Sequence, residues 1–153
     1  MISVKSTGFA IREVFDLNLI HPIRRRNLYP NSPHHFFDPS ESDEWNSAIH
    51  FTAFDGDIHF GCVTLIREPA HNCDFRIRWL GVDQERRSMG VGCALIEMCL
   101  IHAKEAGIWC NVRISAEKPY LELGFEKTGS VFDLPGIGDH FLMRHLRKSN
   151  LTA

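Results

Sequence analysis

The segment from residue 75 to residue 107 constrains the fold more than any other part of the chain. It begins with FRIRWLGV, whose alternation predicts a strand with Arg76 and Arg78 on one face and four residues on the other, namely Phe75, Ile77, Trp79 and Gly81. A turn with two glycines follows, and residues 91–106 then carry apolar side chains at three- and four-residue steps, as an amphipathic helix does. Gly107 is typical of a residue that ends a helix. A strand, a glycine turn and a helix in this order predict an α/β domain.

Patterns on both sides of this segment extend the α/β order. Upstream, SAIHFTAF and IHFGCVTLI predict two strands joined by the turn DGD. Downstream, IWCNVRI predicts a strand, SAEKPYLELGF a short helix, and FEKTGSVFDL and HFLMRHL two closing strands. Near the N-terminus, ISVK predicts a strand, residues 6–20 a helix that His21 and Pro22 end, and residues 22–45 a long irregular loop. The whole order, β-α-β-β-β-α-β-α-β-β, predicts one mixed sheet flanked by helices, in a single domain over residues 1–153.

Charge and cysteine content argue against several classes of protein. The net charge is −2 with acidic and basic residues well mixed, which argues against a nucleic-acid-binding surface. The short basic cluster IRRRN at residues 23–27 is interpreted as a solvated loop. No apolar run is long enough to span a membrane, and the N-terminus lacks the pattern of a signal peptide. The odd count of five cysteines, without a C-x-x-C pair, favours reduced buried thiols in a cytoplasmic protein over disulfides or zinc.

The turn RRSMGVG indicates either an anion site or a tight turn that needs small residues. The first N–H groups of a helix have no partner within the helix, and the helix dipole adds partial positive charge there. Gly90 and Gly92 would let a ligand approach the backbone, and Arg86 and Arg87 would add charged hydrogen bonds. Leu95 stands where a Rossmann fingerprint needs a third glycine, and the Gly-Lys-Ser/Thr of a P-loop is absent.

Four motifs in order resemble the GNAT superfamily of N-acetyltransferases. Residues 87–92, RSMGVG, have the R-x-x-G-x-G form of that family's acetyl-CoA-binding loop, and residues 120–125, YLELGF, resemble its Y-x-x-L-G-F signature. The segments WCNVRISA and GIGDHFLM are similar to the W-C-N-A-R-x-S-A segment and the G-I-x-x-H-x-x-M closing strand of one bacterial branch. The resemblance is specific from about residue 75 to 146 and looser from 9 to 68.

The resemblance implies how acetyl-CoA would bind as co-substrate. In this family the fourth and fifth strands of the sheet splay apart and pantetheine lies in the gap, so the backbone of Leu80, Gly81 and Val82 would contact it. A strand glycine that marks a bulge is the alternative interpretation of Gly81. Asn111 matches the branch's asparagine in the fifth strand and is assigned to the cofactor site, whereas Arg113 would reach a phosphate, the substrate or solvent. The pyrophosphate would rest on six backbone N–H groups, those of Arg87, Ser88, Met89, Gly90, Val91 and Gly92.

The resemblance also implies catalytic residues. Tyr120 aligns with the tyrosine that hydrogen-bonds the departing CoA sulfur, a role that suits a phenol because it is neutral at pH 7; a tyrosine packed under the last strand is the alternative. Pro119 replaces the usual phenylalanine and makes the start of this helix less certain. The fourth strand lacks the glutamate that many relatives use as base, so His140 is the candidate general base, with a structural hydrogen bond as the alternative. The weaker candidates are Asp83, Asp139, Glu117 and His50.

These residues predict transfer of an acetyl group from acetyl-CoA to an amine by direct attack in a ternary complex. The acceptor would be a small-molecule or peptide amine, without a nucleic-acid or membrane partner, and a homodimer is compatible with the sequence. No metal is expected, because the adjacent histidines His34 and His35 point in opposite directions in an extended chain and rarely bind one ion together with Asp38. Three aromatic residues are expected at the substrate end or the core edge, namely Phe36, Phe37 and Trp45. The alternative function is a non-catalytic acyl-CoA-binding regulatory or interaction module.

Overall fold

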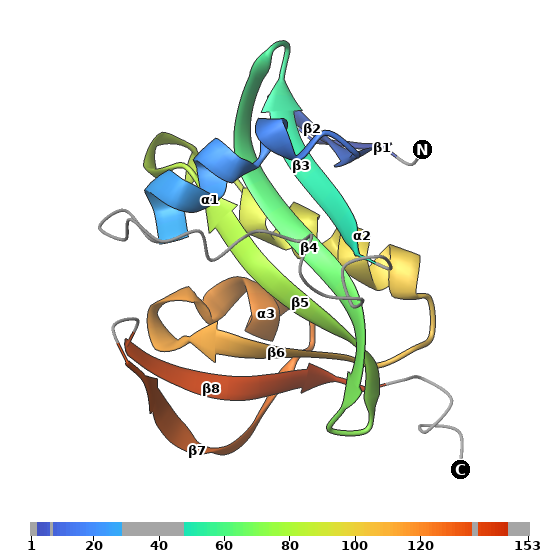
Figure 1. Cartoon of the computed structure of the whole chain (residues 1–153), viewed down its shortest axis with the longest axis vertical. Helices are drawn as coiled ribbons and strands as arrows, with labels where there is room; N and C mark the ends of the chain where they lie inside the picture. Colours follow the sequence, from blue (N-terminus) through green and yellow to red (C-terminus); the bar gives the residue numbers. More distant parts are fainter. Residues whose placement is uncertain (1–2, 7, 29–47, 136–137, 147–153) are drawn as a thin grey trace.

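The computed structural model of the chain describes residues 3–6, 8–28, 48–135 and 138–146. The described strands form one eight-stranded sheet in the order β1-β2-β3-β4-β5-β6-β8-β7. They are β1 (Ser3–Ser6), β2 (Phe9–Val14), β3 (Ile49–Asp55), β4 (Ile58–Ala70), β5 (Cys73–Val82), β6 (Ile108–Arg113), β7 (Glu126–Leu134) and β8 (Gly138–His145). The helices are α1 (His21–Leu28), α2 (Val91–Ala103) and α3 (Lys118–Glu122). Figure 1 shows α1 in front of the sheet and α2 behind it.

Two neighbouring residues of β4 show that α1 and α2 cover opposite faces of the sheet. Cys62 packs with Ile20 and Ile23 on the side of α1. A Cβ added to Gly61 would lie 3.1 Å from the side chain of Val91, so α2 approaches the other face closely enough to favour glycine there. Successive side chains of a strand point to opposite faces. The predicted mixed sheet flanked by helices is therefore confirmed.

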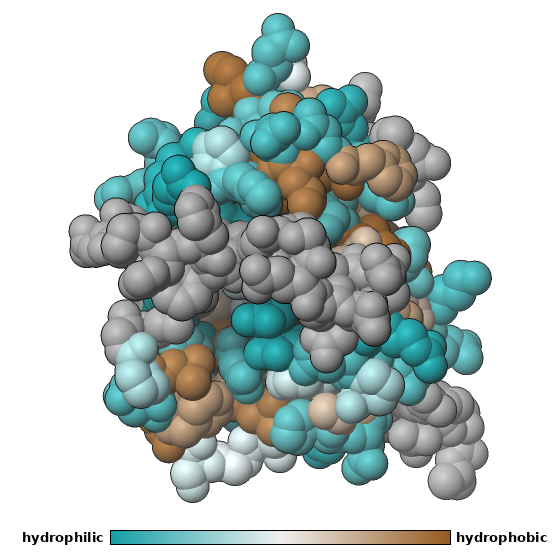
Figure 2. All heavy atoms as spheres, viewed as in Figure 1, coloured by the Kyte–Doolittle hydropathy of each residue, from teal (hydrophilic) through white to brown (hydrophobic). Residues whose placement is uncertain are grey.

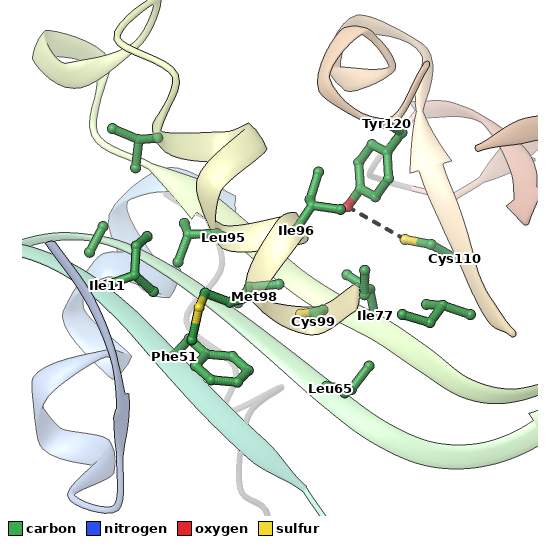
Figure 3. Close-up of a cluster of buried hydrophobic side chains, with 14 of the residues drawn as sticks. Ile11, Phe51, Leu65, Ile77, Leu95, Ile96, Met98, Cys99, Cys110 and Tyr120 are labelled. Carbon is green, nitrogen blue, oxygen red and sulfur yellow. Dashed lines mark hydrogen bonds between the residues drawn. The ribbon is translucent and has the colours of Figure 1, made fainter. Parts of the chain in front are cut away.

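The larger hydrophobic core lies between the sheet and α2. Figure 3 shows Leu95, Met98 and Cys99 of α2 against side chains of the sheet such as Phe51 and Ile77. Each large apolar side chain buried in this way stabilises the fold by about 1.5–3 kcal/mol. The helix predicted from its three- and four-residue spacing is confirmed, and it ends slightly earlier than predicted, at Ala103.

The predicted N-terminal helix is wrong, because residues 9–14 form the strand β2. Phe9 and Ile11 are buried whereas Ala10 and Arg12 are only partly buried, which is the two-residue period of a strand. β2 pairs antiparallel with both β1 and β3. Backbone hydrogen bonds to two neighbouring strands satisfy this segment and outweigh its weak local preference for a helix.

α1 begins where the sequence predicts the end of a helix. His21 is its first residue and Pro22 its second. Proline is tolerated there because the N–H groups of the first turn have no partner within the helix. The prediction of an irregular loop over residues 22–45 is therefore wrong for the part up to Leu28, and residues 29–45 lie outside the described part of the chain.

The basic cluster at residues 23–27 is part of α1 and not a solvated loop, contrary to the prediction. The side chain of Arg24 is fully buried. Its Nη2 donates to Thr64 Oγ1 and lies 3.2 Å from His50 Nδ1, and the guanidinium lies 4.6 Å from the centre of the Trp79 ring. Burial lowers the pKa of Arg24 to about 10, which still leaves the group charged at neutral pH. These partners replace the water that the charge would otherwise need.

β5 contains a bulge that opposes two of its residues to one residue of β4. Cys62 pairs with Gly81 and Thr64 with Arg78, so β5 has one extra residue between these pairs. Trp79 has a positive φ of 54° at this point. A residue with a side chain rarely adopts this conformation, which the two flanking ladder pairs hold in place.

The bulge exchanges the faces of the residues that follow it. Ile77 and Leu80 pack with the core on the side of α2. Trp79 instead stacks with Arg24 of α1, and a Cβ added to Gly81 would lie 3.5 Å from Asn27 of α1. The prediction that Phe75, Ile77, Trp79 and Gly81 share one face is therefore wrong, because strict alternation ends at the extra residue.

β5 and β6 are parallel neighbours that separate after two residue pairs. Phe75 pairs with Ile108 and Arg76 with Trp109, and the described strands form no further pair with each other. β6 pairs instead with β8 along its whole length. The sequence predicts these two as the fourth and fifth strands of the sheet. Because β2 is an additional strand, they are β5 and β6 in the structure. The predicted splay is confirmed, and Figure 1 shows the two arrowheads diverging.

The state of the cysteines and the polarity of the surface agree with the expectations from composition. All five cysteines are thiols outside any disulfide, as predicted, and four of them are buried, namely Cys62, Cys73, Cys99 and Cys110. Within the described ranges, no helix is both long enough and apolar enough to cross a membrane. On the face in Figure 2, hydrophilic residues predominate and hydrophobic residues form small separate groups.

Candidate active site

A cavity of about 730 Å³ opens where β5 and β6 separate. Its walls come from β5 and β6, the turn after β5, the start of α2, α3, the end of α1, and single residues of β7 and β8. Met89 is exposed and is not among the lining residues. The other residues assigned to the site from the sequence all line the cavity: Leu80, Gly81, Val82, Arg87, Ser88, Gly90, Val91, Gly92, Asn111, Tyr120 and His140.

The cavity is lined from both faces of the sheet. Cys110 and Val112 of β6 belong to the core on the side of α2. Asn111 and Arg113 alternate with them and therefore project from the opposite face. All four residues line the cavity, which consequently extends between the two strands from one face of the sheet to the other.

The turn before α2 presents backbone N–H groups at the cavity. Ser88 and Gly90 have positive φ values of 67° and 80°. The N–H of Ala94 donates to Gly90 O over 3.0 Å, so the N–H groups of Val91 and Gly92 precede the first bond of the helix. Left-handed residues directly before a helix N-terminus form an arrangement that binds anions. The donor set fits a pyrophosphate.

The edge of β5 that faces β6 carries backbone groups without a ladder partner beyond Arg76 in the described structure. The predicted pantetheine contacts at Leu80, Gly81 and Val82 lie on this part of the strand. Val82 O accepts a hydrogen bond from Arg87 Nε over 3.1 Å. The bulge directly before Gly81 agrees with the alternative interpretation of this glycine, and an extended ligand arm fits the free edge as well.

Tyr120 reaches the cavity from α3. The helix begins at Lys118 with Pro119 in its first turn, so the proline does not distort the position of the tyrosine. Tyr120 is 3% exposed, and Cys110 Sγ donates to its hydroxyl oxygen over 3.6 Å, as the dashed line in Figure 3 shows. Burial and the neighbouring Cys110 raise the pKa of Tyr120 well above its ordinary value, so the phenol stays protonated.

His140 lines the same cavity from β8, where it is the register partner of Arg113. It is 5% exposed, and its ring stacks with that of Phe132. Nδ1 lies 2.7 Å from Gly138 O. A carbonyl oxygen can only accept, so Nδ1 carries the hydrogen and Nε2 has a free lone pair. The structural hydrogen bond and a base function are thus compatible in one residue.

Two of the weaker base candidates are engaged in ion pairs away from the cavity wall. Asp83 accepts hydrogen bonds from Arg26 and Asn27, each over 2.7 Å. Partial burial opposes ionisation of Asp83, but these bonds outweigh it and lower the pKa. Glu117 Oε2 lies 2.6 Å from Lys127 Nζ.

The remaining candidates do not line the cavity either. His50 is buried beside Arg24, and burial together with that charge lowers its pKa to about 4. Asp139 is exposed on β8. Glu122 was not predicted, yet it lines the cavity and accepts from Cys93 Sγ over 3.2 Å.

The predicted absence of a metal concerns residues that the structure only partly describes. Within the described ranges, no group of three or more His, Cys, Asp or Glu residues could hold a metal ion. His34, His35 and Asp38 lie outside those ranges, as do Phe36, Phe37 and Trp45.

Comparison with known proteins identifies the family. A sequence model of the acetyltransferase (GNAT) domain matches residues 31–145, which is most of the chain. The chain belongs to the GNAT acetyltransferase family. Its GNAT domain includes β5, the glycine turn, α2 and β6, the elements that form the cavity.

Individual relatives agree with the GNAT assignment. The uncharacterized N-acetyltransferase YitI of Bacillus subtilis is 33% identical over 72 residues, which cover 45% of this chain and about half, 48%, of that relative. The crystal structure of Escherichia coli ElaA has a TM-score of 0.71 at 15% identity, over 90% of this chain and 99% of ElaA. Arabidopsis thaliana Naa50 in complex with the bisubstrate analogue CoA-Ac-MVNAL has a TM-score of 0.65 at 20% identity, over 91% of this chain and 99% of that one. At these identities the two structures show a shared fold.

Part of the wall of the GNAT cavity was missed by sequence reasoning. The additional lining side chains include Arg76, Arg78, Cys93, Cys110, Lys118 and Glu122. The charged positions in FRIRW were an available signal, because arginines in an otherwise apolar strand need a polar environment. The contact between Cys93 and Glu122 had no such signal, since it depends on how α2 and α3 pack.

Proposed function

We propose that this chain, as one domain over residues 1–153, transfers an acetyl group from acetyl-CoA to an amine in a ternary complex. The observation that carries the proposal is the cavity between β5 and β6, because it joins an anion-binding turn, a free strand edge and a buried tyrosine hydroxyl. Membership of the GNAT family supports acetyl-CoA as the donor. The pattern of residues 136–143 supports the bacterial branch with the G-I-x-x-H-x-x-M closing strand, and the reduced cysteines support a cytoplasmic location.

Backbone groups of two elements would hold acetyl-CoA. Of the predicted N–H donors, those of Ser88, Gly90, Val91 and Gly92 would bind the pyrophosphate at the positive end of the α2 dipole. The Arg87 N–H donates to Gln84 O over 3.2 Å, and Met89 does not line the cavity. The backbone of residues 80–82 would bind the pantetheine arm, which would complete the edge of β5 as an added strand does. Asn111 of β6 would contact the arm across the gap. This placement directs the thioester toward Tyr120 and leaves the opposite face of the gap to the amine.

The reaction then needs a hydrogen-bond donor for sulfur and an acceptor for the amine proton. The amine nitrogen attacks the thioester carbonyl, the C–N bond forms and the C–S bond breaks. The Tyr120 hydroxyl donates a hydrogen bond to the departing sulfur, and its raised pKa keeps its own proton in place. His140 Nε2 accepts the proton that the attacking nitrogen loses and releases it to solvent, from which the CoA thiolate is protonated.

The change Tyr120→Phe tests this function. It removes the hydroxyl and keeps the ring that packs on Phe125, 5.3 Å away between centroids. Loss of one such donor lowers turnover by about 10²–10³-fold, which release of CoA thiol in the presence of an amine panel would measure. Calorimetry should find the affinity for acetyl-CoA nearly unchanged. Full turnover by this variant would exclude the donor role.

The non-catalytic acyl-CoA-binding module is favoured by one observation. Among the described residues, Glu122 is the single carboxylate on the cavity wall, and it is engaged with Cys93. Binding of acetyl-CoA without thiol release for any amine would decide for the module. In both cases Gly92→Leu should abolish binding in calorimetry, because the new side chain would enter the cavity beside Pro119 of α3, whereas Ser130→Leu on exposed β7 should not. Unchanged binding by Gly92→Leu would remove the anion site.

A further inference from the structure

The described part of the cavity wall carries a large excess of positive charge. Its described lining includes one carboxylate, Glu122, against six permanent cations, namely Arg76, Arg78, Arg86, Arg87, Arg113 and Lys118. A cavity of one sign attracts ligands of the opposite sign and repels ligands of its own sign. The phosphates of CoA would bind some of these cations. The face of the sheet on which each cation lies indicates which of them remain for the acyl acceptor.

The cations divide between the two faces of the sheet. Arg86 and Arg87 belong to the turn before α2, and Lys118 begins α3, so all three lie with the anion-binding backbone. Arg76 and Arg78 flank Ile77, which points into the core on the side of α2, so these arginines project from the opposite face. Arg113 projects from that opposite face as well, because Val112 beside it belongs to the same core. The second group therefore lies where the proposed acceptor would enter.

Within the second group, Arg113 is the cation that is not engaged by another side chain in the described structure. Arg76 Nη1 lies 3.1 Å from Glu68 Oε2, and its guanidinium lies 4.5 Å from the centre of the Trp109 ring. Arg113 forms no ion pair with any carboxylate of the described residues, and it is only partly buried on the cavity wall. Its register partner across the ladder is His140. A fixed positive charge thus stands beside the proposed base.

We propose that Arg113 binds a carboxylate of the acyl acceptor, and that the acceptor is an amine that carries a carboxylate, such as an amino acid or a peptide. This inference rests on the proposed acetyl transfer. A guanidinium binds a carboxylate through two parallel hydrogen bonds, which would orient the acceptor with its amine toward His140. A polyamine would instead bring additional positive charge against Arg76, Arg78 and Arg113.

A panel of matched amines tests the acceptor class. Each α-amino acid, ω-amino acid and dipeptide in the panel is assayed beside its carboxamide and its decarboxylated amine, with CoA thiol release as the readout. We expect the carboxylate form to have a kcat/KM at least about tenfold above both partners. Preference for the carboxamide or the decarboxylated amine would overturn the inference and leave acetyl transfer intact. Absence of thiol release with every amine would overturn both.

Variants of Arg113 test whether this residue causes the preference for amines that carry a carboxylate. Arg113→Gln should raise KM for the carboxylate amines about tenfold or more and leave the calorimetric Kd for acetyl-CoA unchanged. Arg113→Glu should shift the preference toward diamines. Arg144→Gln is the matched control, because Arg144 lies on neighbouring β8 and donates to His71 O. If Arg113→Gln weakened acetyl-CoA binding and left the amine KM unchanged, the arginine would serve a CoA phosphate and the inference would be wrong.

Discussion

Tyr120 and Cys110 meet at the tips of their side chains, and this contact affects what the tyrosine can do. The thiol donates to the phenol oxygen over 3.6 Å, so the hydroxyl hydrogen is free to point elsewhere. Both residues line the cavity, which makes the cavity the open direction for that hydrogen. Cys110 therefore acts as a positioning residue in the proposed reaction. Its own pKa is raised by burial to about 11, so it remains a thiol.

Removal of the thiol should lower turnover without weakening acetyl-CoA binding. We expect Cys110→Val to reduce kcat about threefold to tenfold, the loss of one ordinary hydrogen bond, and Cys110→Ser, which keeps a donor, to recover part of it. Steady-state kinetics and calorimetry measure the two effects. Cys99→Val, a change in the same core away from the hydroxyl contact that Cys110 makes, is the control. A normal kcat for Cys110→Val would contradict the positioning role.

Single residues could be predicted from the sequence where a short local motif places them. Tyr120 and Gly90 fall into this class, because the strand, turn and helix around each are continuous in the chain. Arg24 could not be predicted as buried. Its partners include Thr64 of β4 and Trp79 of β5, which are distant in the sequence, and a run of arginines is ordinarily solvated.

At the scale of elements, Asp83 fastens α1 to the end of β5. Its two carboxylate oxygens accept from Arg26 Nε and Nη2, and Oδ1 also accepts from Asn27 Nδ2. These three bonds connect the last turn of α1 with the residue that directly follows β5. The helix on the proposed acceptor face is thereby held against the strand that would bind pantetheine.

Asp83→Asn should destabilise the protein at neutral pH and much less in acid. The pKa of Asp83 is lower in the folded chain than its ordinary value of 3.8. Its contribution is therefore complete above that value and disappears as the pH falls through the folded pKa. We expect a loss of about 1–2 kcal/mol at pH 7 in urea unfolding, with variant and parent converging toward pH 2. Asp57→Asn in the exposed β3–β4 turn is the control, and a pH-independent difference would contradict the ion-pair account.

The sequence correctly predicts elements with a strong hydrophobic period. It does not predict elements whose identity depends on pairing with a distant strand. α2 and the β3–β4 hairpin follow from spacing and turn residues near each other in the chain. β2 is a short amphipathic segment that fits either structure by itself, and its pairing with β3, about forty residues away in the sequence, decides the outcome. The same limit applies to α1, where the sequence predicts a helix end at Pro22 and the structure has a helix start.

For the molecule as a whole, one buried cluster connects three elements on the face of α1. Arg24 of α1 contacts Thr64 of β4, and His50 of β3 lies beside both. Burial, then the charge of Arg24, and then His21 lower the pKa of His50 to about 4 from 6.5. The fold therefore requires a neutral His50 next to a charged Arg24. Protonation would place two positive charges together in the interior.

The free energy of unfolding should consequently decrease in mild acid. A histidine whose pKa is depressed on folding contributes stability above pH 6.5, and that contribution disappears as the pH falls from 6.5 to about 4. The expected loss over this window is about 3 kcal/mol, measured by denaturant unfolding at successive pH values. His50→Asn should remove much of this slope, whereas His71→Gln at an exposed position should keep it. An equal slope in His50→Asn would assign the acid sensitivity to other groups.

The bulge in β5 makes the length of this strand more important than its composition. If the same residues paired with β4 without the bulge, plain alternation would continue past Arg78. Gly81 would then turn toward α2 and Leu80 toward α1, so that a bulky side chain would meet Asn27 where a glycine now leaves room. We therefore expect homologous chains to keep the extra residue between Arg78 and Gly81, and with it the bulge. In evolutionary terms, the spacing is the inherited character and the side chains vary around it.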